Sequence, residues 1–206
     1  MRKLILSIAT SLDGYIARAD GSLDWFLSDA EFEEEMLGVL RGVDAMLFGR
    51  VSYELLAQYW PTAGTQAAGE APGGFTSRAR EIEFARLMNS TPKVVYSSTL
   101  QSTSWGPTTI TREIDPQEIV RQKCQRGRDL VLFAGGKLAL SFAKLDLIDE
   151  YRLMVHPILL GKGLPLFDGL DSELGLELAR TTTFPCGVVL LQYQRASARA
   201  SSRRAE

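Results

Sequence analysis

Histidine and cysteine are scarce in this sequence, which holds one histidine, His156, and two cysteines, Cys124 and Cys186, among 206 residues. The cysteines have no CxxC spacing, and with one histidine available a zinc site of Cys and His ligands is nearly excluded. We therefore expect two ordinary thiols, a structural histidine and no metal site.

Long apolar runs and a net charge of one sign are also missing. No apolar run approaches the ~20 residues that a membrane-spanning helix needs. The formal net charge is −2, so no basic field favours nucleic acid or an anionic membrane as a partner. Hydrophobic residues make up 45% and charged residues 23% of the chain, as in a soluble globular protein. The sequence predicts one large domain with a substantial core, located in the cytoplasm.

Short apolar runs alternate with helical patterns along the chain. The clearest run is Leu130–Ala134, whose five apolar residues suit a strand buried on both faces. A helical pattern follows from Lys137 to Lys144. Two further helices carry N-terminal signals, a capping box at Ser28-Asp29-Ala30-Glu31 and an N-cap, proline and glutamate at Asp115-Pro116-Gln117-Glu118. The other expected strands are Leu4–Ala9, Asp44–Phe48, Lys93–Tyr96, Thr108–Thr111 and Glu150–His156.

This alternation predicts an α/β fold with right-handed crossovers and a mostly parallel sheet covered on both faces. Two late segments, residues 176–184 and 188–194, flank a Pro-Cys-Gly turn and predict a C-terminal antiparallel hairpin. Residues 61–76 hold four glycines and two prolines, which favours a surface loop or lid. The Ser/Arg/Ala-rich residues 196–206 are expected to be a disordered tail, which leaves residues 1–195 as the domain.

The turns at the carboxyl ends of the expected strands are small and rich in glycine or hydroxyl groups. Ligands in open parallel sheets bind beyond these ends. Glycines let a backbone approach a ligand, and a helix N-terminus offers free N–H groups to an anion. We therefore expect a phosphate-bearing ligand at this edge of the sheet. The turns are residues 10–14, Gly49-Arg50, Ser97-Ser98, Gly135-Gly136-Lys137 and residues 160–163.

On these motifs the chain resembles the dihydrofolate reductase-like superfamily, in the branch that includes the reductase domain of the riboflavin-biosynthesis deaminase–reductase, the RibD C-terminal domain. The resemblance covers residues 1–195. It implies a three-layer α/β/α fold, a homodimer, and an NADPH-dependent oxidoreductase that transfers hydride to a pyrimidine- or pteridine-like heterocycle. The matching motifs are Ser11-Leu12-Asp13-Gly14, Gly49-Arg50-x-Ser52, Ser97-Ser98, Gly135-Gly136-Lys137 and Pro157-x-x-Leu160-Gly161-x-Gly163.

The resemblance also implies roles for individual residues. On the cofactor side, Arg50 and Lys137 would lie near the 2′-phosphate of NADPH. Ser97 and Ser98 would reach the adenosine end, and Ala9 would line the nicotinamide. The remaining cofactor residues would hold or admit the other phosphates; they are Gly49, Ser52, Gly135 and Gly136.

On the substrate side, Asp13 would line the nicotinamide and substrate, and Trp25 would stack on a planar substrate. Asp13 or Asp24, or a water held by either, would supply the proton. The family carries a glutamate two residues before the glycine matched by Gly135, where this chain has Phe133. The resemblance therefore implies an activity like that of the 5-amino-6-(5-phosphoribosylamino)uracil reductase, with the substrate itself left open. The helix carboxylate of dihydrofolate reductases has Asp24 and Asp29 as its nearest equivalents.

Each of these residues also has a plain structural interpretation. Asp13 before a glycine is typical of a turn, and Arg50 can pair with a surface carboxylate. Trp25 can belong to the core, and Ser97-Ser98 can cap the end of a strand. A second function class therefore stays open, a non-catalytic nucleotide- or pterin-binding protein on the same fold.

Overall fold

The computed structural model describes residues 1–63 and 74–196. The expected lid falls partly, and the expected tail almost wholly, outside these ranges.

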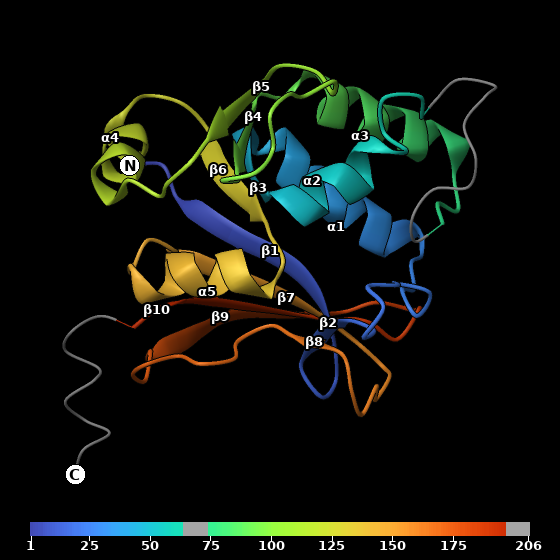
Figure 1. Cartoon of the computed structure of the whole chain (residues 1–206). Coiled ribbons are helices and arrows are strands. Elements are labelled where there is room, and N and C mark those ends of the chain that lie inside the picture. Colours follow the sequence, from blue (N-terminus) through green and yellow to red (C-terminus); the bar gives the residue numbers. More distant parts are fainter. Residues whose placement is uncertain (64–73, 197–206) are drawn as a thin grey trace, which may run out of the picture.

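An eight-stranded sheet crosses the molecule, in the order β5-β4-β3-β6-β1-β7-β10-β9 (Figure 1). The first six strands in this order, from β5 at the edge to β7, run parallel to one another, and β10 and β9 add an antiparallel hairpin. The predictions of a mostly parallel sheet and of a C-terminal hairpin are both confirmed. The strands are β1 Leu4–Ser11, β3 Val43–Gly49, β4 Lys93–Tyr96, β5 Thr108–Thr111, β6 Asp129–Phe133, β7 Glu150–His156, β9 Leu176–Thr183 and β10 Val189–Arg195.

The helices cover both faces of the sheet (Figure 1). Helices α1 and α3 pack together and, with α2, enclose a first core, while α4 and α5 enclose a second. A third, smaller cluster joins Phe32 of α1 to β7 and to the C-terminal hairpin. Both faces of strand β6 are covered, and its apolar run is therefore unbroken. Val131 belongs to the first core, and Leu130 and Leu132 belong to the second. All three are at most 1% exposed, so the prediction of a strand buried on both faces is confirmed. The helices are α1 Ala30–Arg41, α2 Arg50–Ala57, α3 Arg78–Ser90, α4 Pro116–Cys124 and α5 Gly136–Lys144.

Helices α1 and α4 each begin with an aspartate whose side chain caps the first turn. Asp115 caps α4 with Pro116 in the first turn, as predicted. Helix α1 is capped by Asp29, whose carboxylate accepts from the N–H groups of Glu31 and Phe32. The predicted capping box was therefore one residue out of register, because the Ser28 hydroxyl donates to the carbonyl of Gly74 instead. The carboxylate stabilises the positive end of the α1 dipole.

A second, two-stranded sheet was not predicted. It joins β2, Tyr15–Ala17, to β8, Leu164–Pro165, and lies beyond the carboxyl end of β1 (Figure 1). Two and three residues are too few for a periodic pattern to reveal a strand. The backbone of Pro165 in β8 lies against Gly136 at the start of α5.

Candidate active site

Two helices begin with glycine at the same edge of the sheet. Gly49 is the N-cap of α2 and Gly135 is the N-cap of α5, and neither helix has a side-chain cap. The strands that lead into them, β3 and β6, are neighbours in the sheet. The first N–H groups of both helices therefore keep their capacity to bind an anion, and both dipoles are positive at this edge.

The two helix starts face each other. A Cβ atom built on Gly49 would lie 3.6 Å from the side chain of Leu138 in α5. One built on Gly135 would find its nearest neighbours, the side chains of Ile16 and Ser52, only at 4.0 Å. Gly135 thus has open space, and the hydroxyl-bearing residue of α2 borders it. Both helix starts lie at the edge where the sequence predicts a phosphate, and the phosphate contact itself stays a prediction.

The third turn at this edge follows β4, which pairs with β3. The Ser97 hydroxyl is committed to the turn, because it accepts from the N–H groups of Thr99 and Leu100 at 3.2 and 2.9 Å. Ser98 is exposed. The cofactor contact that the sequence predicts for Ser97 would compete with these two hydrogen bonds, whereas the exposed Ser98 takes no part in them.

Arg112 is a residue that the sequence reasoning missed. It follows the last residue of β5, and its Nη1 donates to the carbonyls of Ser97 and Leu100 at 3.0 and 2.9 Å. The guanidinium therefore fixes the turn after β4 and adds a positive charge beside Ser98. Its signal in the sequence was weak, a single arginine after a short polar strand.

Two predicted cations flank the glycine turns. Arg50 opens α2 and pairs with Glu54 at 2.7 Å, one turn along the helix. Such a pair between half-exposed side chains is weak, so an incoming phosphate can replace the carboxylate. Lys137 is exposed in the first turn of α5. Arg50, Ser98 and Lys137 thus follow three neighbouring strands, β3, β4 and β6.

Gly136 has a different reason to be glycine from the predicted one. A Cβ atom there would lie well under 3.0 Å from the carbonyl oxygen of Pro165 in β8. The missing side chain admits a strand of the small sheet, whereas the sequence predicted that it admits a pyrophosphate. Gly135 is the turn glycine whose open space suits a ligand.

Asp13 ties two loops together. Its carboxylate accepts from the Ser11 hydroxyl at 2.6 Å and from the N–H groups of Leu160 and Gly161 at 3.1 and 2.7 Å. The Ser11 bond first, and then the backbone donors, lower the pKa of Asp13 to about 2. The side chain is therefore an anion at neutral pH. This geometry favours a positioning role and gives no support to the predicted proton donation.

The other predicted substrate-side residues are engaged by partners of their own. Asp24 is exposed and pairs with Arg18 at 2.6 Å. Trp25 is 5% exposed and packs edge-on against His156, with ring centroids 5.1 Å apart. Asp29 caps α1 and also accepts from the N–H of Cys186. None of them lines the pocket described next, so their substrate roles stay predictions that the geometry does not favour.

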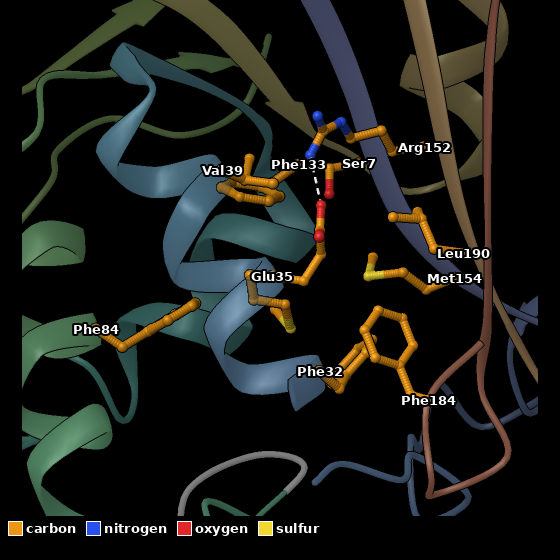
Figure 2. A pocket seen from close by; sticks show the side chains of 11 residues that line it. Ser7, Phe32, Glu35, Val39, Phe84, Phe133, Arg152, Met154, Phe184 and Leu190 are labelled. Atoms are coloured by element: carbon orange, nitrogen blue, oxygen red, sulfur yellow. Dashed lines mark hydrogen bonds and ion pairs between the residues drawn. The ribbon is translucent and has the colours of Figure 1, made fainter. Parts of the chain in front are cut away.

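A mostly apolar pocket lies between α1 and the sheet, where Glu35 points from the helix toward Arg152 (Figure 2). Its floor comes from four neighbouring strands, β6, β1, β7 and β10. It has room for about one water molecule, so a larger ligand needs side chains to move. Its polar members are Ser7, Glu35 and Arg152, and its apolar members are Phe32, Met36, Val39, Phe84, Phe133, Met154, Phe184 and Leu190.

The pocket and the glycine-rich edge are linked by β1. Ser7 lies in the pocket, and Ala9, predicted to line the nicotinamide, lies two residues nearer the carboxyl end on the same face. Phe133 is in the pocket and is followed, after Ala134, by the N-cap glycine of α5. The pocket therefore lies next to the glycine-rich edge along β1 and β6.

Among the described residues, no group of three or more His, Cys, Asp or Glu side chains is arranged to hold a metal ion. No helix in the same part of the chain has the length and apolar character to cross a membrane.

Comparison with known proteins assigns this arrangement to a family. The profile of the RibD C-terminal domain matches residues 2–190. The chain belongs to the RibD C-terminal domain family. The uncharacterized protein YyaP of Bacillus subtilis (strain 168) is 33% identical over 192 residues, which are 93% of this chain and 94% of YyaP.

Solved structures agree with the family. A candidate riboflavin biosynthesis protein from Shewanella sp. PV-4 is 25% identical, with a TM-score of 0.72 over 95% of this chain and 99% of that chain. Dihydrofolate reductase from Enterococcus faecalis, complexed with NADP(H), has a TM-score of 0.58 at 13% identity, over 95% of this chain and 97% of that one. The second likeness concerns the fold alone. This RibD C-terminal domain therefore has the dihydrofolate reductase-like fold.

Proposed function

We propose that this RibD C-terminal domain is an NADPH-dependent reductase of a small planar heterocycle. The observation that carries the proposal is the meeting of two uncapped helix N-termini, α2 and α5, beside three strand ends that bear Arg50, Ser98 and Lys137. NADPH, when bound, supplies the hydride. The N–H groups after Gly49 and Gly135 would hold its pyrophosphate, and the two cations would hold its 2′-phosphate.

The chain's own task is to hold two rings in contact and exclude water. The substrate ring would enter the pocket under α1 once its side chains move apart, and there it would meet apolar side chains and the polar atoms of Ser7 and Glu35. Ala9, beside the pocket on β1, keeps the place predicted for the nicotinamide. Asp13 would hold the loops at this end of β1 in position.

The cofactor claim predicts a selective loss of affinity. Arg50→Ala and Lys137→Ala should each weaken NADPH binding about tenfold, because a charge-assisted contact to the 2′-phosphate disappears. NADH lacks this phosphate, so its weaker binding should stay nearly unchanged. Titration of both cofactors by tryptophan fluorescence measures the difference.

Lys144→Ala is the matched control, since Lys144 ends the same helix α5 and pairs with Asp171 at 2.8 Å. It should bind both cofactors as the wild-type protein does. An equal loss for NADPH and NADH in Arg50→Ala or Lys137→Ala would contradict the assignment of the 2′-phosphate.

A second function is a non-catalytic nucleotide- or pterin-binding protein. It is favoured by the narrow pocket and by the low pKa of Asp13, which leaves that residue without a proton to donate. NADPH oxidation with a panel of pterins and pyrimidines separates the two functions. Tight cofactor binding without turnover across the panel supports the binding protein, and substrate-dependent oxidation supports the reductase.

A further inference from the structure

Lys93 is buried without a carboxylate partner. Its side chain lies at the start of β4, is 1% exposed, and donates from Nζ to the carbonyl of Thr91 at 2.9 Å. The ammonium also lies over the ring of Trp105, 4.6 Å from its centroid. In the described part of the chain no carboxylate comes within ion-pair distance of this Nζ. A buried charge without a counter-ion costs free energy, so this lysine calls for a role that an apolar side chain would not fill.

A second buried lysine, Lys123, shows the contrast. It is 7% exposed, and its Nζ lies 2.6 and 2.8 Å from the two carboxylate oxygens of Asp149. Lys93 has an aromatic ring in place of such a carboxylate. Burial lowers the pKa of Lys93 to about 8, so the side chain is charged at pH 7 and mostly neutral at pH 9.

The ring of Trp105 contacts both sides of the start of α2. Its centroid lies 5.9 Å from that of Phe48 and 5.7 Å from that of Tyr53. The backbone N–H of Trp105 also donates to the Tyr53 hydroxyl at 3.1 Å. Phe48 directly precedes Gly49, the N-cap of α2, and Tyr53 lies one turn into that helix. Trp105 therefore supports the helix start from the core.

The indole is itself held by α3 and by its own turn. Its Nε1 donates to the side-chain oxygen of Asn89 at 2.6 Å, and the Asn89 amide donates to the carbonyl of Trp60 at 2.9 Å. Gly106 follows with a φ of 59°, and a Cβ atom there would lie 3.2 Å from the Nζ of Lys93. The turn can therefore lie against the ammonium because it has glycine at this position.

We infer that Trp105, seated on the Lys93 ammonium, is a positioning residue for the start of α2. The inference rests on the proposed function, because this helix start is where NADPH phosphates are proposed to bind. The charged ammonium holds the indole by a cation–π contact, and the indole holds Phe48 and Tyr53. The positive charge on β4, a strand that contacts α2, also favours an anion at the helix N-terminus. Loss of the charge should therefore weaken phosphate binding while the fold is kept.

The neighbouring strands bring no competing charge to Lys93. Strands β3 and β5 place Met46 and Thr108 opposite it in the register. Arg112, beyond the other end of β5, donates to carbonyls of the turn after β4.

The charged groups of α3 face another helix. Glu83 pairs with an arginine of α1, and Arg86 lies near that carboxylate. On α2, Tyr53 is the titratable residue that touches Trp105. A change in binding between pH 7 and pH 9 that Lys93→Met abolishes is therefore assigned to Lys93.

The first test measures NADPH affinity at pH 7 and pH 9 by calorimetry. The wild-type protein should bind NADPH about threefold or more weakly at pH 9, because Lys93 has lost its charge. Lys93→Met places an apolar side chain of similar length in an apolar site, so it should fold. It should show the weaker affinity at both pH values.

Lys123→Met is the matched control, since it removes the other buried lysine and should keep the wild-type difference between pH 7 and pH 9. The inference is overturned if Lys93→Met keeps that difference, or if the wild-type protein binds NADPH equally well at both pH values.

The second test needs no cofactor. Tyr53→Phe keeps the ring and removes the acceptor of the Trp105 N–H, so amide hydrogen exchange at pH 7 should become faster in α2, residues 50–57. Helix α4 should exchange as in the wild-type protein. Unchanged exchange in α2 would overturn the inference. If the wild-type protein binds no NADPH, the reductase proposal falls, and exchange in α2 alone decides whether Trp105 positions this helix.

Discussion

Alanine at position 136 is expected to lower the free energy of unfolding by about 3 kcal/mol, whereas alanine at position 135 should leave stability nearly unchanged. The new Cβ at 136 would overlap the backbone carbonyl of Pro165, and backbone cannot move aside as a flexible side chain can. At Gly135, φ is −69° and ψ is 167°, a conformation open to alanine, and the nearest atoms lie at 4.0 Å. Urea unfolding of the two variants measures the difference.

The same pair of variants tests the cofactor proposal. Gly135→Ala places a methyl group in the space between the starts of α2 and α5, so it should weaken NADPH binding about tenfold while the fold is kept. A Gly135→Ala protein with wild-type stability and wild-type NADPH affinity would remove the phosphate site from this turn. Equal stability of the two variants would show that β8 does not press on Gly136.

Acid should destabilise the protein through His156, which is 0% exposed. Its Nδ1 accepts from the N–H of Leu27 at 3.2 Å, so the neutral ring carries its proton on Nε2. Aromatic rings of Trp25, Phe26 and Phe32 surround it. Burial lowers the pKa of His156 to about 4, because a charged imidazolium has no water in this environment.

The unfolded state binds the proton near pH 6.5, and the folded state binds it only near pH 4. The stability from His156 is therefore fully present above about pH 6.5 and is lost as the pH falls toward 4. Between pH 7 and pH 5 the loss should be about 2 kcal/mol. Urea unfolding at the two pH values measures it.

His156→Phe isolates this contribution. The variant should be less stable at pH 7 by about 1–3 kcal/mol, because the Leu27 N–H loses its acceptor. It should also lose about 2 kcal/mol less than the wild-type protein between pH 7 and pH 5. Equal pH dependence of the two proteins would show that His156 does not titrate in this range.

Much of the edge where the cofactor is proposed to bind could be predicted, because each turn there is encoded by a few consecutive residues. A glycine that follows an apolar strand and opens a helix is visible over a few residues, as at Gly49 and Gly135. Parallel topology then brings the ends of β3, β4 and β6 together. The cofactor roles of these residues stay predictions, as do the homodimer and the cytoplasmic location.

The substrate pocket could not be predicted because its polar residues meet across the fold. Glu35 and Arg152 are 117 positions apart and touch only because α1 covers β7. In sequence, Glu35 belongs to a run of helix carboxylates, Glu33, Glu34 and Glu35, and nothing local marks which one faces inward. The sequence pointed instead to Asp13, Asp24 and Trp25, whose own partners occupy them.

The sequence by itself determined the alternation of strands and helices, the buried central strand β6 and the glycine turns at its carboxyl edge, because local periodicity and turn chemistry need few neighbours. Only the tertiary structure decided which glycine has open space beside it and which faces β8, and which carboxylate lines the pocket. These outcomes depend on contacts between distant segments, and a one-dimensional pattern carries no distance between them.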